Sequence, residues 1–419
     1  MNTDIKKRVW IINHYAIPPT LGGLNRHYYF SKYLAQLGYE VKIFTSSAIH
    51  NTSINVITDN ELFVEKDIME VPYIFVRTSD YRGNGLQRIK NIFEFPLRMN
   101  RIAKQFSSPD IIYTSSPDPF CAFFAVRLAK KYKIPCIVEV RDLWPESIVC
   151  YKRMSRKNPI IKAMYKLEKF LYEKSDLLIF TMAGGWKYIC DQKWDKIISS
   201  EKVNHINNGV DLKGFKEQSV LEIRPTLKEW MNKGFCVTYV GSIRKANHLL
   251  VLIEAAKILK KQHNHDILFA IFGDGEERKS LEKLAEDENL HNLRFFGFLN
   301  KGEVPAVLSN SKLNIIQYDD VDVWKYGGSQ NKLFEYFASG RPVLSSVQMG
   351  FSLIKKYKAG VEVSSYSAEE IVKKIIEMRD LDERIYNEYC ENSLRAALDH
   401  DYEYLTEKLK QLLDKVINQ

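Results

Sequence analysis

Short apolar runs alternate with stretches of helical periodicity along most of this chain of 419 residues. Residues 9–13 form one such run, apolar residues then recur at helical spacing as far as Gly38, and residues 41–45 form another run. Parallel strands need a connection about as long as a helix, so a strand, a helix and a second strand in this order predict a parallel sheet. The chain is therefore expected to fold as an α/β protein.

The alternation occurs in two successive series. Further strands are predicted in the first series and, after Asn204, in the second: 110–114, 136–140, 177–181, 235–240, 267–272, 293–297, 313–317 and 342–346. The simplest fold is two doubly wound, Rossmann-like domains that face each other across a cleft. We expect an N-terminal domain over residues 1–203 and a C-terminal domain over 204–399. Residues 47–108 are the least regular stretch and are interpreted as an insertion in the first domain.

Cysteine usage and hydropathy favour a cytoplasmic protein. The six cysteines are scattered, without a C-x-x-C pair or a histidine at metal-ligand spacing, which predicts reduced thiols and no structural zinc. The first apolar run is too short for the core of a signal peptide. No run approaches the roughly 18 apolar residues of a spanning helix. We therefore expect the chain to span no membrane.

Positive charge is concentrated in the first half. The net charge is +9, with an excess of 11 positive charges over residues 1–203 and of 2 negative charges over 204–419. Such asymmetry indicates an anionic partner, or merely a lysine-rich surface. Residues 86–104 and 152–174 are basic and amphipathic; they either lie on an anionic inner-membrane surface or pack on the sheet. Aromatic–basic interleaving is absent, so no nucleic-acid partner is expected.

Glycines follow two of the predicted strands, at the edge where open α/β sheets bind ligands. Gly22 and Gly23 open the first helix, where free N–H groups can meet an anion. Gly273 and Gly275 flank one residue after the strand 267–272, but the third glycine of a dinucleotide fingerprint is replaced by Arg278. The pattern therefore indicates backbone close to a ligand and does not favour a nicotinamide cofactor.

The loop after the strand 235–240 combines glycine with positive charge. Gly241 is followed by Ser242, and then by Arg244 and Lys245. Cations at a helix start are mildly unfavourable with respect to the helix dipole, which favours a functional interpretation over a solvated surface. These residues are suited to a diphosphate without a metal.

Two further charged segments are candidates for binding or catalysis. Lys332 and Glu335 share one face of a predicted helix, where lysine can meet phosphate and glutamate can accept bonds from ribose hydroxyls. A surface salt bridge is the alternative. Arg141, Asp142 and Glu146 gather in the loop after the strand 136–140, where acid–base or acceptor-binding work is plausible and an internal ion pair is the alternative.

The order of these segments resembles glycosyltransferase family 4. The segments that carry the resemblance are residues 18–23 (PPTLGG), 206–211 (INNGVD), Gly241, 272–275 (FGDG), 296–299 (FGFL) and 331–343 (NKLFEYFASGRPV). They cover nearly the whole chain. Residues 141–146 together with 331–332 resemble a subgroup that builds bacterial capsule and O-antigen polysaccharides.

The resemblance implies a GT-B fold and a retaining, metal-independent transfer from a nucleotide sugar, with a UDP-sugar favoured over a GDP-sugar, to a lipid-diphosphate-linked glycan. Lys245 and Lys332 would hold the diphosphate and assist catalysis, and Glu335 would bind ribose. The other donor-binding positions would be Gly22, Gly23, Gly241, Ser242, Arg244, Gly273, Gly275, Phe298 and Leu299. A C-terminal helix over 400–419 would cross back to the first domain. No cofactor or metal is expected, although residues 320–322 read D-x-D.

This sequence departs from the family pattern at three positions. Ser242 follows Gly241 where many members have arginine, and Gly327 stands eight residues before Glu335 where a paired glutamate is usual. The loop at Arg141 lacks the histidine common in the family, and Asp142 is the candidate to replace it as a catalytic residue, on the acceptor side with Arg141 and Glu146. The alternatives are a nucleotide-sugar epimerase on the same fold and a non-enzymatic protein that binds anionic surfaces.

Overall fold

The computed structural model of the chain describes residues 6–22, 25–50, 52–81, 83, 85–116 and 118–418. The chain divides into two compact units, one of Met1–Asn207 with Tyr402–Gln419 and the other of Asn208–Asp401. Each unit has its own sheet with helices on both faces. The predicted α/β class with two doubly wound sheets is confirmed. In the described part of the chain, no helix is long and apolar enough to cross a bilayer.

The sheet of the first unit has the order β3-β4-β2-β1-β5-β6-β7-β8. All neighbouring strands are parallel except the pair β3–β4. The strands are β1 Arg8–Ile12, β2 Glu40–Ser46, β3 Phe63–Ile68, β4 Val71–Val76, β5 Ile111–Ser116, β6 Cys136–Val140, β7 Leu177–Phe180 and β8 Val203–His205.

The interpretation of residues 47–108 as an insertion is wrong, because this stretch supplies β3, β4 and the helix α2 Leu86–Ile102. β3 reads FVEKDI and is largely solvent-exposed, as expected of a strand at the edge of a sheet. An exposed edge strand has no apolar run, which is why the sequence pattern did not reveal it.

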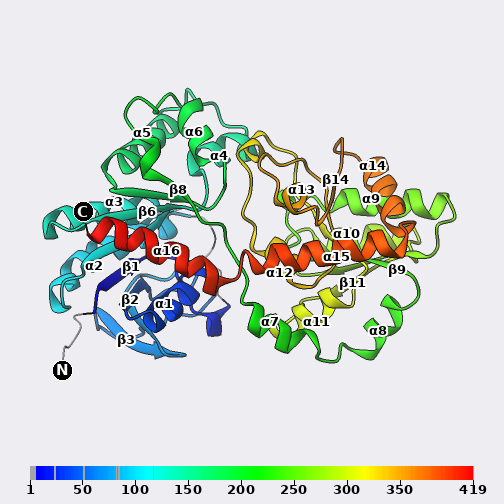
Figure 1. Cartoon of the computed structure of the whole chain (residues 1–419), viewed down its shortest axis with the longest axis horizontal. Coiled ribbons are helices and arrows are strands. Elements are labelled where there is room, and N and C mark those ends of the chain that lie inside the picture. Colours follow the sequence, from blue (N-terminus) through cyan, green and yellow to red (C-terminus); the bar gives the residue numbers. More distant parts are fainter. Residues whose placement is uncertain are drawn as a thin grey trace. The chain divides into compact units, whose positions relative to one another are not determined.

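Helices cover both faces of this first sheet. α1 Arg26–Gln36 and α16 Tyr402–Ile417 pack against each other and share one core with the strands (Figure 1). The predicted C-terminal helix that returns to the first domain is thereby confirmed, and Leu405, Leu409 and Leu413 of its apolar stripe are buried in that core. The remaining helices of the unit are α2, α3 Pro119–Tyr132, α4 Trp144–Lys152, α5 Pro159–Lys174 and α6 Gly185–Asp191.

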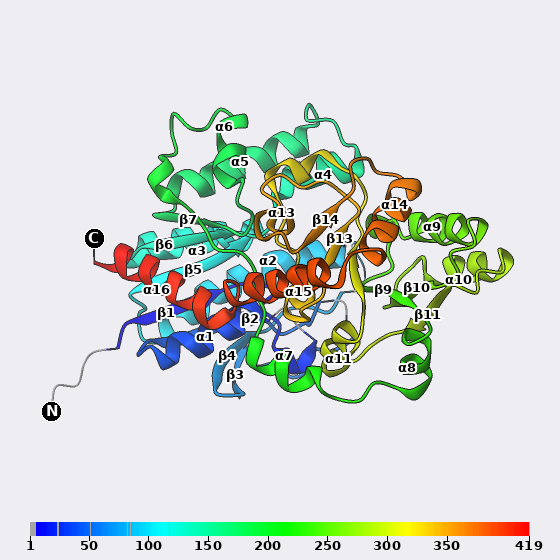
Figure 2. The ribbon, with the colours of Figure 1, turned by 45° about the vertical axis from the view of Figure 1, so that its right-hand side comes forward.

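The sheet of the second unit is parallel throughout, in the order β11-β10-β9-β12-β13-β14. Its strands are β9 Phe235–Val240, β10 Ile267–Phe272, β11 Leu293–Gly297, β12 Leu313–Ile316, β13 Val343–Ser345 and β14 Gly360–Glu362, of which β9, β10 and β11 run side by side in Figure 2. The chain order reverses between β9 and β12. A reversal of this kind is where open α/β sheets bind ligands, beyond the carboxyl ends of the strands.

Two apolar cores flank this second sheet. One lies under α9 Leu250–Lys261, α10 Arg278–Asp287 and α14 Ala368–Arg379. The other lies under α7 Leu212–Ser219, α8 Pro225–Met231, α11 Val304–Ser309, α12 Asn331–Ala338, α13 Leu353–Tyr357 and α15 Glu383–Leu398. α12 therefore rests on a packed core while its first turn stands at the carboxyl end of the sheet.

A buried ionic network lies under the start of α1 in the first unit. Arg26 Nε donates to Glu139 Oε1 at 2.5 Å, and both side chains are fully buried. Ser115 and His27 reach the other carboxylate oxygen at 2.7 and 3.2 Å. Burial opposes ionisation of Glu139, but Arg26 and His27 outweigh it and hold its pKa well below its ordinary value.

The same arginine fixes the end of the first unit. Its guanidinium also donates to the backbone carbonyls of Ile206 and Asn207, the last residues before the second unit begins. Phe30 packs against the guanidinium with its ring centroid 4.5 Å away. A buried charge with this many partners stabilises a specific arrangement, and removal of one partner leaves the other charge uncompensated.

We predict that Glu139→Gln destabilises the protein by about 3–5 kcal/mol, because Arg26 would stay buried without a counter-charge. Urea unfolding followed by circular dichroism measures the loss. The matched control is Glu65→Gln on β3, whose contact with Lys42 is 4.0 Å long and half-exposed. This control should change stability by less than about 1 kcal/mol. Equal losses in the two variants would contradict the importance of the buried network.

Candidate functional site

The carboxyl end of β9 meets the first turn of α12 at Gly241. A Cβ atom added to Gly241 would lie 2.7 Å from Lys332 Nζ and 3.0 Å from the hydroxyl of Tyr239. The absence of a side chain at Gly241 therefore makes room for the lysine ammonium beside the loop backbone. The structure thus brings together Gly241 and Lys332, two of the predicted donor-binding residues.

Lys332 is held between aromatic rings. Its Nζ lies 4.6 Å from the ring centroid of Tyr239 and 4.9 Å from that of Tyr318, and it donates to the Tyr239 hydroxyl at 3.2 Å. Burial lowers the pKa of Lys332 to about 7, against the opposite effect of Glu335. Aromatic faces and one hydroxyl solvate an ammonium poorly compared with water, so this group gains from any anion placed beside it.

Glu335 follows one turn along the same helix and has a related environment. Burial raises its pKa, while Lys301 and Lys332 act in the opposite direction. Within the described residues its carboxylate forms no hydrogen bond or salt bridge. A half-buried carboxylate without a donor is available to accept bonds from hydroxyl groups of a ligand.

The predicted glycines Gly273 and Gly275 serve the packing of the loops. A Cβ on Gly273 would collide with the carbonyl of Gly241, and one on Gly275 with the carbonyl of Ile243. Gly273 also has φ +136°, which side chains rarely adopt. These two glycines let the loop after β10 lie directly against the loop after β9, and so fix where Gly241 stands.

The other predicted donor-side residues vary in exposure. Arg244 and Lys245 are exposed at the start of a short 3₁₀ turn, and their charged ends form no hydrogen bond or ion pair with a described side chain. The hydroxyl of Ser242 bonds to the Asn247 amide at 3.0 Å. Phe298 is 70% exposed, whereas its neighbour Leu299 is buried in the core.

The first unit holds the other predicted residues. Gly22 has φ +78° and ends a short 3₁₀ turn, while Gly23 lies outside the described residues. Arg141 is half-buried and Asp142 is exposed, just beyond the carboxyl end of β6. Glu146 is buried, and its carboxylate is already bound by the Tyr165 hydroxyl at 2.5 Å and by Arg156.

Sequence reasoning did not find three residues around Lys332 and Glu335. Tyr239 lies in an apolar strand and Tyr318 two residues after another, where an aromatic residue is typical of core packing. Lys301 belongs to a lysine-rich sequence and has no motif of its own. Tyr239 is the last but one residue of β9 and Tyr318 lies two residues after β12, and only the strand order shows that these two strands border the reversal of the sheet.

The Asn-Gly-Val-Asp segment supports the loop before α12. The amide N–H of Asn208 donates to Ser329 Oγ at 2.7 Å, and its side-chain amide donates to the carbonyl of Ser329. In the acidic segment after Tyr318, Asp322 is paired with Lys325 at 3.1 Å. The Asn-Gly-Val-Asp segment therefore positions the start of α12, and through it Lys332.

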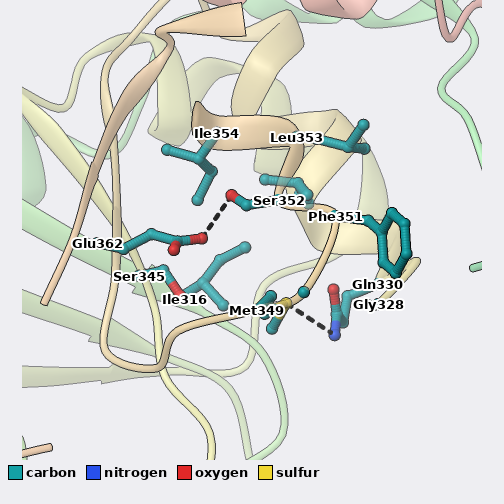
Figure 3. A pocket seen from close by; sticks show the side chains of 12 residues that line it. Ile316, Gly328, Gln330, Ser345, Met349, Phe351, Ser352, Leu353, Ile354 and Glu362 are labelled. Atoms are coloured by element: carbon teal, nitrogen blue, oxygen red, sulfur yellow. Dashed lines mark hydrogen bonds between the residues drawn. The ribbon is translucent and has the colours of Figure 1, made fainter. Parts of the chain in front are cut away.

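A small pocket lies on the other side of the same loop (Figure 3). Ile316, Leu353 and Ile354 give it an apolar wall, and the amide of Gln330 points across it to Met349 Sδ at 3.9 Å. Ser352 donates to Glu362 at 2.5 Å on the opposite side. The pocket thus lies between the loop before α12 and α13.

Family models match both parts of the chain. The model described as Glycosyltransferase Family 4 matches residues 21–213, and the model described as Glycosyl transferases group 1 matches residues 227–394. The two matches support a glycosyltransferase of family 4. Both models are named for glycosyl transfer, so they do not favour the epimerase alternative.

Two curated relatives of this chain are distant in sequence. It is 22% identical over 255 residues to MJ1069 of Methanocaldococcus jannaschii, an uncharacterized glycosyltransferase, with 60% of this chain and 61% of that protein covered. It is 20% identical over 278 residues to WbjE of Pseudomonas aeruginosa, a probable glycosyltransferase, with 64% of each chain covered. The matches thus span less than two thirds of these relatives.

Solved structures establish the fold as GT-B. Sucrose-phosphate synthase from Thermosynechococcus elongatus superposes with a TM-score of 0.74 at 16% identity, over 99% of both chains. Anabaena HepE in complex with UDP has a TM-score of 0.69 at 12% identity, over 98% of this chain and 100% of that one. WaaG, involved in lipopolysaccharide biosynthesis, has a TM-score of 0.62 at 15% identity, over 97% and 99%.

We predict losses of stability of different size for two glycine substitutions in this chain. Gly241→Ala meets the flexible end of Lys332 and should cost less than about 1 kcal/mol of stability while it displaces the ammonium. Gly273→Ala meets backbone and has an unfavourable φ, so it should cost about 2 kcal/mol or more. Chemical denaturation measures both. Similar losses in the free energy of unfolding would contradict the prediction, because the loop would then tolerate or reject a methyl group equally at the two positions.

Proposed function

We propose that this family 4 protein is a glycosyltransferase of the hexosyltransferase type that moves a sugar from a nucleotide-diphosphate sugar to a lipid-diphosphate-linked glycan, with retention of configuration. The observation that carries the proposal is the poorly solvated ammonium of Lys332 beside Gly241 at the reversal of the second sheet. A UDP-sugar is favoured over a GDP-sugar, and HepE, a relative in fold, was solved with UDP.

The diphosphate is proposed to lie against Gly241 and the first turn of α12. The first N–H groups of a helix have no intrahelical partners and favour an anion. Lys332 stands in that turn, and the exposed Arg244 and Lys245 can close over the phosphates from the other loop. This set of donors supplies positive charge without requiring a metal ion.

The nucleoside is proposed to lie next to the diphosphate. The unbound carboxylate of Glu335 can accept hydrogen bonds from two hydroxyl groups of the ribose. These hydroxyl groups are proposed to lie about one turn of helix from the phosphates. The exposed ring of Phe298 offers a surface for the base, and Leu299 anchors this segment in the core. Gly22 and Gly23 are proposed to lie over the sugar-phosphate.

Departure of the nucleotide diphosphate is the step that these residues assist. Negative charge grows on the leaving oxygen as the glycosidic bond to the sugar breaks. Lys332 meets that charge in a site where water is already displaced, so it needs little reorganisation. Lys245 is proposed to add a second positive charge, and Asp142 to orient the acceptor hydroxyl together with Arg141.

A lipid-linked acceptor is supported by the charge of the first half of the chain and by the likeness in fold to WaaG, which is involved in lipopolysaccharide biosynthesis. An acceptor that carries a diphosphate is itself anionic. We accordingly propose a role in bacterial surface polysaccharide synthesis. Glu146, predicted on the acceptor side, is buried and bound, and its proposed contribution is to hold α4 against α5.

The first prediction for this function concerns nucleotide binding. UDP at 100 times its Kd should raise the free energy of unfolding by about 2.7 kcal/mol. Thermal-shift titrations with UDP, GDP, ADP and dTDP measure this stabilisation. Uridine and inorganic phosphate are the controls for the nucleoside and the phosphate parts of the ligand. If none of the four nucleotides stabilises the protein, the proposed donor is wrong. Stabilisation by GDP alone would replace the proposed preference for a UDP-sugar with a preference for a GDP-sugar.

The second prediction concerns turnover. Lys332→Met should lower the rate of transfer at least tenfold, which corresponds to about 1.4 kcal/mol of barrier. Lys325→Met is the matched control, because this lysine also lies over a tyrosine ring, at 5.2 Å from Tyr326, but is paired with Asp322. The control should retain activity within about twofold.

The same two variants test the pKa of the ammonium. Nucleotide binding favours charged Lys332, so affinity is full below its unbound pKa of about 7 and falls as pH rises above it. Phosphate esters lose their last proton near pH 6, so titrations between about pH 7 and 9 isolate the lysine. Lys332→Met should remove this dependence, and the proposal fails if it persists unchanged.

A further inference from the structure

Helix α2 has an apolar side that is largely exposed in the described structure. Leu86 is 83% exposed, Ile89 50%, Phe93 38% and Leu97 51%. Spacings of three and four residues place these side chains on one face of the helix. We refer to these four residues as the α2 stripe.

The opposite side of α2 is buried. Phe95, Met99 and Ile102 pack into the unit, and Asn91 is fully buried. α2 therefore has the two apolar sides that a helix needs when it lies between a core and a second apolar phase. In contrast, Ile161 and Leu171 of the similarly basic helix α5 are buried in the unit.

Basic residues surround the α2 stripe. Lys90, Arg101 and Lys104 are exposed along or beyond the helix, close to the direction of the stripe. α2 packs on α3, and α3 on α5, so the three helices form one layer. Together they carry eleven basic and three acidic residues.

The three acidic residues of this layer cancel only part of that charge. Glu94 binds the backbone and hydroxyl of Ser79 at 2.6 and 2.9 Å, and it pairs with Lys90 at 3.7 Å and with Arg98 at 3.3 Å. Glu173 pairs with its neighbour Lys174. Glu168 is buried between the hydroxyls of Tyr172 and Tyr188, at 2.8 and 2.7 Å. In comparison, α16 on the other face of the sheet carries three basic and three acidic residues.

Aromatic rings continue the apolar surface from α2 onto its neighbours. Phe93 meets Phe120 of α3 with centroids 4.5 Å apart, and Phe123 of α3 meets Phe170 of α5 at 5.4 Å. Arg127 lies over Phe123 at 5.5 Å. The layer thus combines half-buried aromatic rings with cations, which suits the boundary between headgroups and acyl chains.

We propose that the α2 stripe inserts into the surface of an anionic lipid bilayer, with the basic residues of α2, α3 and α5 against the headgroups. An interfacial helix buries its apolar face about 5–10 Å into the bilayer, and each nearby lysine or arginine adds attraction to anionic lipid. The match of an apolar stripe to acyl chains and of its basic rim to anionic headgroups selects a bilayer as the occupant. A nucleic acid would leave the four apolar side chains uncovered.

Docking of α2 would also orient the side of the sheet where the acceptor is expected. His14, just after β1, bonds to Asn91 of α2 at 2.6 Å and to Asp118 at 2.8 Å. Arg88 of α2 donates to the hydroxyl of Tyr15 at 3.2 Å. The carboxyl ends of β1 and β5 are thus tied to the docked helix. This consequence for a lipid-linked acceptor rests on the proposed function, whereas bilayer binding itself does not need a nucleotide.

Vesicle flotation without nucleotide tests the proposal. The full chain should float with vesicles that contain phosphatidylglycerol, and bind at least about tenfold less to vesicles of phosphatidylcholine alone or at high salt. The triple variant Leu86→Gln, Ile89→Gln, Leu97→Gln should bind the anionic vesicles at least about tenfold more weakly. Glutamine is a good helix former, so α2 should persist, and circular dichroism with UDP thermal shifts verifies the fold and the donor site.

The matched control removes three exposed apolar residues from the second unit: Val220→Gln, Leu221→Gln and Leu398→Gln. These side chains are 80%, 54% and 63% exposed, and the control should float like the wild type. Absence of wild-type flotation, or an equal loss in both triple variants, would overturn the proposal. A wild type that floats but binds none of the nucleotides would refute the proposed function and leave the docking surface standing.

Discussion

The buried ion pair between Arg26 and Glu139 is the interaction on which the first unit depends. It joins the start of α1 to the interior strand β6, and the same guanidinium binds the carbonyls of residues 206 and 207. Taking a carboxylate and a guanidinium out of water is costly, and the cost is offset only where every charged oxygen and N–H finds a partner. The chain therefore leaves the first unit at a fixed place. Tyr402, where the chain returns to the first unit, stacks on Tyr29 of α1 with ring centroids 4.9 Å apart.

A second constraint acts on the candidate donor site. The loops after β9 and β10 lie so close together that only glycine fits at Gly273 and Gly275. This contact fixes Gly241, and Gly241 leaves the space that the ammonium of Lys332 occupies. The tyrosines around that ammonium remove water from it and lower its pKa. Backbone packing and side-chain electrostatics are thereby parts of one arrangement.

The sequence predicted some of these residues for reasons that the structure refines. Gly273 and Gly275 were predicted as ligand-binding glycines, and the structure gives each a packing reason that needs no ligand. Lys332 and Glu335 were predicted to share a helix face, and they do so in one half-buried environment. Tyr239, Tyr318 and Lys301 went unnoticed, because tyrosines in or near apolar strands and a single loop lysine give no local sign of the residues that they meet. Glu146 carries a charge that the sequence placed at a site, whereas α4 and α5 bury it.

The sequence by itself determined the α/β class, the two sheets and the helix that returns to the first unit, because strand and helix periodicities are local properties of the chain. Tertiary structure alone decided which apolar faces are covered. Residues 86–104 and 152–174 have similar patterns, yet α5 buries Ile161 and Leu171 while α2 keeps its core side and exposes a second stripe. Tertiary structure also decided the pKa of Lys332, since desolvation depends on neighbours that lie far away in sequence.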